Sequence, residues 1–141
     1  MAAFQKFNAF VEHLAEKVHN LGADNLKIML TLTAPTAANS VKADLVEIAA
    51  GNGYTAGGTA VNITDSSQAA GVYKLTGDDV VFTAAGGAIA NFRYAVLYND
   101  SPTSPADPLI GFWDYGSTVT LNSGDTFTVD LDQVAGILTV T

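Results

Sequence analysis

Residues 89–116 read I-A-N-F-R-Y-A-V-L-Y-N-D, then S-P-T-S-P-A-D-P, then L-I-G-F-W-D-Y-G. Two apolar segments rich in aromatic residues flank a loop that holds three of the four prolines of the chain. Because proline has no N–H group for a strand ladder, we expect the chain to leave its sheet after Asp100 and to re-enter at Leu109. The stretch also contains the only tryptophan and three of the five tyrosines, so the main packing contacts of an all-β domain are expected here.

Other strands are indicated by alternation of apolar and polar residues and by turn signals. Residues 26–32 alternate with a period of two, which is typical of a half-buried strand. Further strands are expected at 59–64, 71–76, 79–84, 88–99, 109–115, 117–121 and 137–141, whereas 43–50 fits either a strand or a helical turn. Asn122, Ser123 and Gly124 predict a hairpin that pairs 118–121 with 126–131. Together these signals predict an all-β, jelly-roll-like antiparallel sandwich.

One amphipathic helix is expected at the N-terminus, over residues 4–21. Apolar residues recur there at spacings of three and four, which places them on one helix face: Phe4, Phe7, Val11, Leu14, Val18 and Leu21. Gly22 follows the last of them, where a left-handed cap forms at little cost. The chain is therefore expected to be a single domain, 1–141, with a helix in 1–22 and a sandwich in 23–141.

Composition favours a protein that associates with other chains. The chain of 141 residues is 48% hydrophobic and only 14% charged, against a usual charged fraction of about 25%. No apolar run approaches the roughly 20 residues that cross a bilayer, so no membrane partner is expected. The net charge of −8 repels phosphate backbones, so nucleic acid is not an expected partner either. Without cysteine, stability cannot come from disulfides, and association of identical chains is the expected source.

No residue pattern indicates catalysis, a metal or a cofactor. His13 and His19 are six residues apart, which would place them on different faces of one helix. Asp78 and Asp79 fit a turn, while Asp130 and Asp132 could share a strand face but lack the further oxygen ligands of a calcium loop. The glycines in 51–58 lack the Lys-Ser/Thr of a phosphate loop. The sequence thus predicts no enzyme.

The aromatic residues after the proline loop are the strongest binding candidates. If Phe112 faces the core, alternation along the strand turns Trp113 and Tyr115 to the opposite face. Exposed there, the two rings could stack on a sugar or anchor a protein contact. Alternatively, both rings pack against the second layer of the sandwich.

The segments F-Q-K-F-N-A-F-V-E-H-L-A-E-K-V-H-N-L-G (4–22), F-R-Y-A-V-L-Y-N-D (92–100) and P-L-I-G-F-W-D-Y-G (108–116) together resemble small virion proteins of tailed bacteriophages. The C-terminal D-T-F-T-V-D-L-D and G-I-L-T-V-T fit the same group, so the resemblance covers nearly the whole chain. Members of this group include capsid cement (decoration) proteins with a jelly-roll fold.

The resemblance implies a structural protein on the outer surface of an HK97-type phage head, where it bridges capsomers. Its implied partners are the major capsid protein and further copies of itself, with a dimer expected. We expect contacts to involve the helix face and the aromatic segment: Phe4, Phe7, Val11, Leu14, Phe112, Trp113 and Tyr115. The alternative is a tail or fibre component that binds a host-surface glycan through Trp113 and Tyr115.

Overall fold

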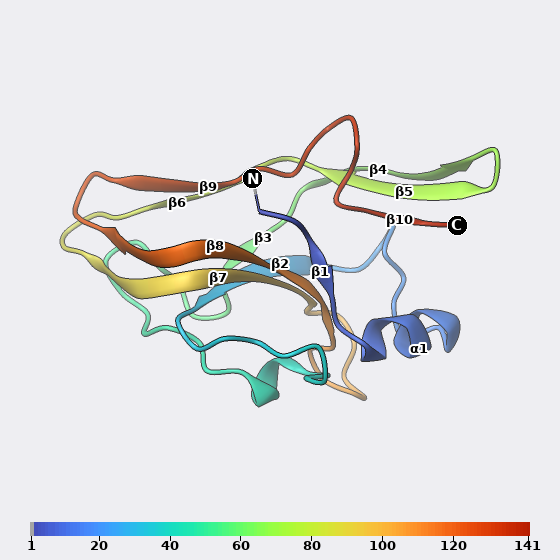
Figure 1. The fold of residues 1–141 in the computed structure, drawn as a ribbon, viewed down its shortest axis with the longest axis horizontal. Helices are drawn as coiled ribbons and strands as arrows, with labels where there is room; N and C mark the ends of the chain where they lie inside the picture. The colour runs from blue at the N-terminus through green and yellow to red at the C-terminus, as the bar shows by residue number, and fades with distance from the viewer. Residues whose placement is uncertain (1) are drawn as a thin grey trace.

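The computed structural model describes residues 2–141 and is an antiparallel β sandwich with one short helix near the N-terminus, as the sequence predicted (Figure 1). The first layer is a five-stranded sheet in the order β1-β8-β7-β2-β3. Its strands are β1 (Gln5–Lys6), β8 (Leu109–Leu121), β7 (Ile89–Asn99), β2 (Leu26–Thr31) and β3 (Thr59–Ala60). An ideal jelly roll has eight strands in two sheets. Here the second layer is divided into two short sheets.

The second layer consists of one sheet in the order β10-β5-β4 and another formed by β6 and β9. Its strands are β4 (Ile63–Ala69), β5 (Val72–Gly77), β6 (Val80–Thr83), β9 (Thr126–Val129) and β10 (Leu138–Val140). β5 continues into β6 after a two-residue break. β10 pairs with β5, and β9 pairs with β6. The two small sheets therefore lie end to end over the first layer (Figure 1).

The predicted hairpin between 118–121 and 126–131 is wrong. β8 pairs with β7 along its length, whereas β9 pairs with β6, with Phe127 opposite Phe82. The turn signal at Asn122–Gly124 is real, because the Asn122 N–H donates to Asp125 and the Asp125 N–H donates to the Asn122 carbonyl. The turn carries the chain from one layer to the other instead of joining neighbours within a sheet, a difference that the local sequence does not encode.

The N-terminal helix is much shorter than the predicted 4–21. α1 covers only Ala9–Ala15, and the preceding residues form β1, where Gln5 lies opposite Phe112 on β8. The helix ends because Lys17 adopts a positive φ of 67° and the Val18 N–H returns to the His13 carbonyl. The predicted cap at Gly22 therefore lies five residues too late.

The apolar residues expected on one helix face are divided among different surroundings. Phe7 and Leu21 are buried, whereas Val11 is 50% exposed. Phe7 packs on Phe112 at a ring distance of 5.1 Å, and Phe4 packs on Trp113 at 5.2 Å. The three- and four-residue spacing thus arises from a strand and a short helix that follow one another, because tertiary contacts override the local helical pattern.

The first sheet is buried on both faces, so β2 is not half-buried as the alternation suggested. Leu26, Ile28 and Leu30 face the core between the layers, whereas Met29 belongs to a second cluster on the outer face. That second cluster consists of Phe7, Met29, Tyr94, Val96, Tyr98, Leu109 and Phe112, with Leu45 packed against it. The segment 43–50, which the sequence left open, contains the end of a 3₁₀ turn, η1 (Lys42–Asp44), and otherwise no regular structure.

The proline loop lies where the sequence placed it. β7 ends at Asn99, one residue before the exit expected at Asp100, and β8 begins at Leu109 as predicted. β8 continues through Gly116 to Leu121, joining two strands that were expected separately. Within residues 2–141 no helix is long and apolar enough to cross a bilayer.

Candidate functional site

Three of the predicted contact residues, Leu14, Trp113 and Tyr115, line two separate cavities. One is a groove at the end of the sandwich that carries α1, and it includes Leu14. The other is a small pocket between the layers, which includes Trp113 and Tyr115. Phe7 and Phe112 line neither of them, because they are enclosed in the cluster on the outer face of the first sheet. Phe7 is fully buried within its own chain, so it cannot reach another molecule without local unfolding.

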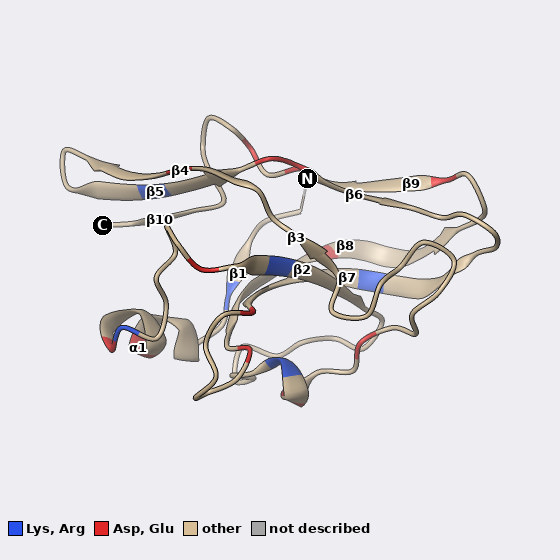
Figure 2. Cartoon of the chain, turned by 180° about the vertical axis from the view of Figure 1, so that it is seen from behind, with Lys and Arg blue, Asp and Glu red and all other residues tan. Residues whose placement is uncertain are grey.

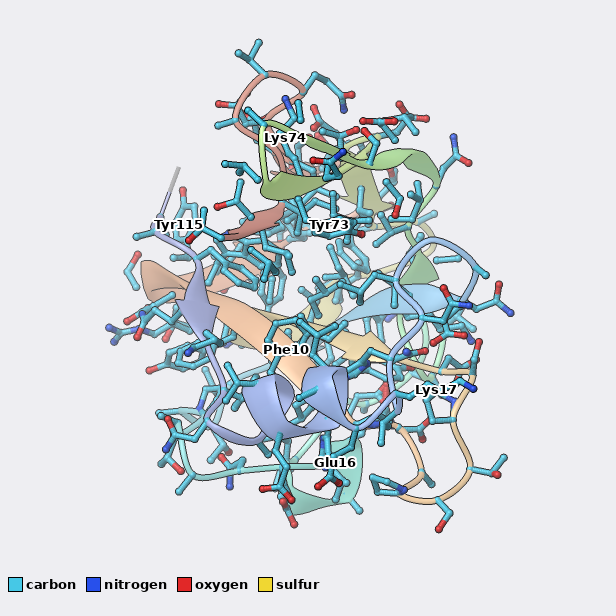
Figure 3. All side chains as sticks on the ribbon, turned by 90° about the vertical axis from the view of Figure 1, so that its right-hand side faces the viewer. Phe10, Glu16, Lys17, Tyr73, Lys74 and Tyr115 are labelled. Atoms are coloured by element: carbon cyan, nitrogen blue, oxygen red, sulfur yellow. The ribbon has the colours of Figure 1, made fainter. Side chains whose placement is uncertain are left out.

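The first place, which we call the helix-end groove, has a volume of about 490 Å³ and lies between the segment that follows α1 and the sheet β10-β5-β4. Figure 3 looks onto this end of the molecule, with Tyr73 of β5 on one side, Phe10 of α1 on the other and Glu16 pointing away from the sheets. The apolar residues that line the groove are Leu14, Val18, Leu21, Tyr73 and Val140, and the polar ones are Lys17, His19, Asn20, Asp24 and Ser66, together with Gly22.

The groove exists because the chain reverses after α1. The positive φ of Lys17 turns residues 18–24 back along the helix, and Gly22 comes so close to Ser66 that an added Cβ would lie 2.9 Å from its hydroxyl oxygen. Lys17 and Leu14 thereby line the same groove as Tyr73 and Val140 of the sheet. A groove that combines apolar residues with a few charged ones suits an apolar segment of a protein partner.

His19 joins this groove to the core through a buried polar network. Its Nδ1 lies 3.0 Å from Asn99 Nδ2, which also donates to Asp24 at 2.7 Å. The orientation of the Asn99 amide follows from its oxygen, which accepts the Ser101 N–H. His19 Nδ1 is therefore the acceptor, and the ring proton is on Nε2. Burial, and next the nearby His13, lower the pKa of His19 to about 4, while Asp24 opposes the shift.

The two histidines are not far apart on different helix faces, contrary to the sequence interpretation. The reversal after α1 places their rings 6.0 Å apart, centre to centre. His13 Nδ1 and His19 Nε2 are buried and have no hydrogen-bond partner among residues 2–141. Within the same range, no three residues with metal-binding side chains are grouped closely enough to hold a metal ion.

The second place, which we call the aromatic pocket, has a volume of about 200 Å³ and is lined by Ala2, Arg93, Ala95, Trp113, Tyr115 and Phe127. Trp113 and Ala95 belong to the core between the layers, while Tyr115 is 58% exposed. Tyr115 meets Phe127 of β9 edge to face, with ring centres 5.5 Å apart. The pocket thus lies between β8 of the first layer and β9 of the second.

Of the Trp113 and Tyr115 rings, whose exposure the sequence left open, only that of Tyr115 is exposed. Alternation along β8 does separate Phe112 from Trp113, but Trp113 faces the core between the layers, is only 6% exposed and packs under Phe4. Phe112 faces the outer cluster instead. Tyr115 is the accessible ring, and in Figure 3 it projects at the edge of the molecule.

A charged pair adjoins the aromatic pocket. The Arg93 guanidinium donates to both carboxylate oxygens of Asp114, at 2.8 and 3.1 Å, and the Gly116 N–H donates to one of them at 2.8 Å. These hydrogen bonds, that of Arg93 first, hold the pKa of Asp114 below its usual value, so the carboxylate stays charged. Two hydrogen bonds to one carboxylate fix the orientation of the planar guanidinium.

The acidic pairs found in the sequence stabilise loops. Asp79 accepts the Leu131 N–H, and Asp78 accepts from the Asn62 amide. Asp132 accepts the N–H groups of Val134 and Ala135, which lowers its pKa. Asp130 and Asp132 both lie beyond the end of β9 at Val129, so they do not share a strand face as the sequence suggested.

Sequence reasoning missed Arg93, Phe127 and the loop around His19 as site residues. Arg93 and Phe127 are 34 positions apart and meet only because β9 crosses to the second layer. No local signal marks them. The positive φ of Lys17 is similarly hidden, since lysine is not a residue that favours this conformation.

Comparison with models of protein families, with curated proteins and with solved structures finds no match to this chain.

Proposed function

We propose that this chain is a structural virion protein, a capsid cement protein that binds the outside of an HK97-type phage head and bridges its capsomers. The observation that carries the proposal is the helix-end groove, an open groove at one end of the sandwich that is lined by apolar as well as polar residues. Several residues that line the groove belong to the segment 4–22, which resembles small virion proteins of tailed bacteriophages. The partner is the major capsid protein, and the groove accepts one of its apolar segments.

Exposed apolar side chains on the elements around the groove support this assignment. Val11 on α1 is 50% exposed, and Val140 on β10 is 37% exposed. Val72, at the start of β5, is exposed as well. Burying a fully exposed valine is worth about 1.5 kcal/mol by area, and these half-exposed valines contribute less each, so several of them would act together in a contact on a shell.

The distribution of charge supports a position on the outside of the shell. The second layer and its loops, residues 63–85 and 122–141, carry six aspartates and a single lysine, which accounts for five of the eight net negative charges. Figure 2 shows this layer with one blue segment, on β5, and several red ones. A protein with this field is repelled by packaged DNA and keeps to the outside of the shell.

The test is co-sedimentation with genome-emptied heads and, separately, with isolated tails of the phage that encodes the chain. We expect saturable binding to heads at a fixed ratio to capsid protein. The double variant Val11→Asp and Val140→Asp should abolish it, because it places two charges beside the groove. The control is Val81→Asp on β6, which changes a valine that is as exposed as Val11, 50%, on another part of the surface.

Each result decides between clear alternatives. Binding of the control but not of the double variant supports the groove as the docking surface. Equal binding of both variants would remove the groove from the contact. Binding of the wild-type chain to tails alone would contradict the cement function.

A further inference from the structure

We propose that the aromatic pocket binds one neutral sugar ring. The inference does not depend on the cement function, because it rests on a different part of the molecule. The pocket is built by four segments that are distant in sequence: the N-terminal residues before β1, β7, β8 and β9. Its composition, size and charge each limit the ligands that it accepts.

The composition of the pocket suits a ligand that has an apolar face. Trp113 and Ala95 form its buried base, and Tyr115 and Phe127 present rings beside it. Tyr115 is held by its edge-to-face contact with Phe127, which itself meets Phe92 at 4.9 Å. Aromatic side chains held in this way offer a fixed surface to the C–H face of a pyranose and lose little entropy on binding.

The size of the pocket excludes extended ligands. Sites for drug-sized molecules have volumes of about 300–1,000 Å³. This pocket has about 200 Å³, which suits a single ring with the rest of a chain outside. A terminal residue of a glycan meets this condition.

Charge selects against ionic ligands. A cation would have to enter beside the positively charged Arg93, one of the residues that line the pocket. An anion would have to compete with Asp114, whose two oxygens already hold that guanidinium, and would approach a chain of net charge −8. A neutral ligand is neither repelled by Arg93 nor in competition with Asp114.

Arg93 also supplies hydrogen-bond donors for hydroxyl groups. The guanidinium has five N–H donors, and the bonds to Asp114 use Nε and one terminal nitrogen, so the other terminal nitrogen has its donors left for a ligand. Asp114 does not line the pocket itself, and its contribution is to hold the guanidinium of Arg93. The polar contact offered to a sugar hydroxyl therefore comes from Arg93.

The experiment uses the tryptophan fluorescence of the whole chain, because Trp113 is the only tryptophan and lies in the pocket. The probes are methyl glycosides of glucose, galactose, mannose and N-acetylglucosamine, titrated into the millimolar range. Choline and inorganic phosphate serve as ionic probes. We expect a saturable change with at least one glycoside and none with either ion.

Variants at the exposed ring connect the signal to the pocket. Tyr115→Ala should weaken binding at least tenfold, while Tyr115→Phe, which keeps the ring, should bind within a few-fold of wild type. Val81→Ala, on a different surface, should leave binding unchanged. Because Tyr115 is exposed, the variants are expected to fold, which circular dichroism checks. No saturable response to any glycoside, a response to choline or phosphate instead, or unchanged binding by Tyr115→Ala would each overturn the proposal.

Discussion

The ionisation of the His19 side chain is tied to the folded state. It is buried, its Nδ1 accepts from Asn99 and its pKa is lowered to about 4, chiefly by burial. In the unfolded chain a histidine has a pKa near 6.5, so between the two values the unfolded state binds more protons than the folded one. The free energy of unfolding should therefore decrease as the pH falls from about 6.5 towards 4.

The difference between 6.5 and about 4 corresponds to a loss of about 3 kcal/mol once the pH has fallen below both values. Urea unfolding between pH 7.5 and pH 4 measures this loss, and nuclear magnetic resonance of the ring carbons gives the pKa directly. A His19 ring that titrates near 6.5 in the folded protein would contradict the buried, neutral assignment. The variant His19→Gln should show a flatter dependence of stability on pH.

Phe7 and Val11 were predicted to share one face, and their different burial can be tested directly. Phe7 is fully enclosed, so Phe7→Ala should cost about 3–5 kcal/mol of unfolding free energy. Val11 is half exposed, so Val11→Ala should change stability by less than about 0.5 kcal/mol. Urea unfolding of both variants provides the measurement. Equal losses would contradict the difference in burial and favour the single helix face predicted for residues 4–21.

β1 stays attached to the sandwich because one residue of β8 has no side chain. A Cβ on Gly111 would lie 2.1 Å from the Phe4 ring and 2.8 Å from the Gln5 carbonyl oxygen. Gly111→Ala should therefore displace β1 at a cost of about 1–3 kcal/mol. Trp113 loses the cover of Phe4 in this variant, so its fluorescence should shift to longer wavelength.

The double variant Phe4→Ala and Gly111→Ala is the matched control. Removing the Phe4 ring relieves the closest contact, so Gly111→Ala should cost less stability in the Phe4→Ala background than in the wild type. Additive losses would show that β1 is not held through Phe4.

For the whole molecule, the low fraction of charged residues and the exposed apolar side chains predict self-association. The expected state is a dimer, measured by sedimentation equilibrium over a wide range of protein concentration. Val11→Asp should favour the monomer if copies meet at the α1 end. A chain that stays monomeric at all concentrations would contradict the prediction. A variant that loses shell binding but remains dimeric would place the two contacts on different surfaces.

The amino-acid sequence by itself determined the fold class, the strands around the proline loop, the exit of the chain to within one residue of Asn99 and its re-entry at Leu109. These features depend on local chemistry: alternation, β-branched and aromatic residues, and the missing N–H of proline. The extent of α1, the crossing of β9 to the second layer and the proximity of His13 to His19 were decided by tertiary structure. In each case the local pattern suits two conformations, and only burial against distant residues such as Phe112, Phe82 and Asn99 selects one of them. The same reason explains the aromatic pocket, whose residues are brought together only by the stacking of the two layers.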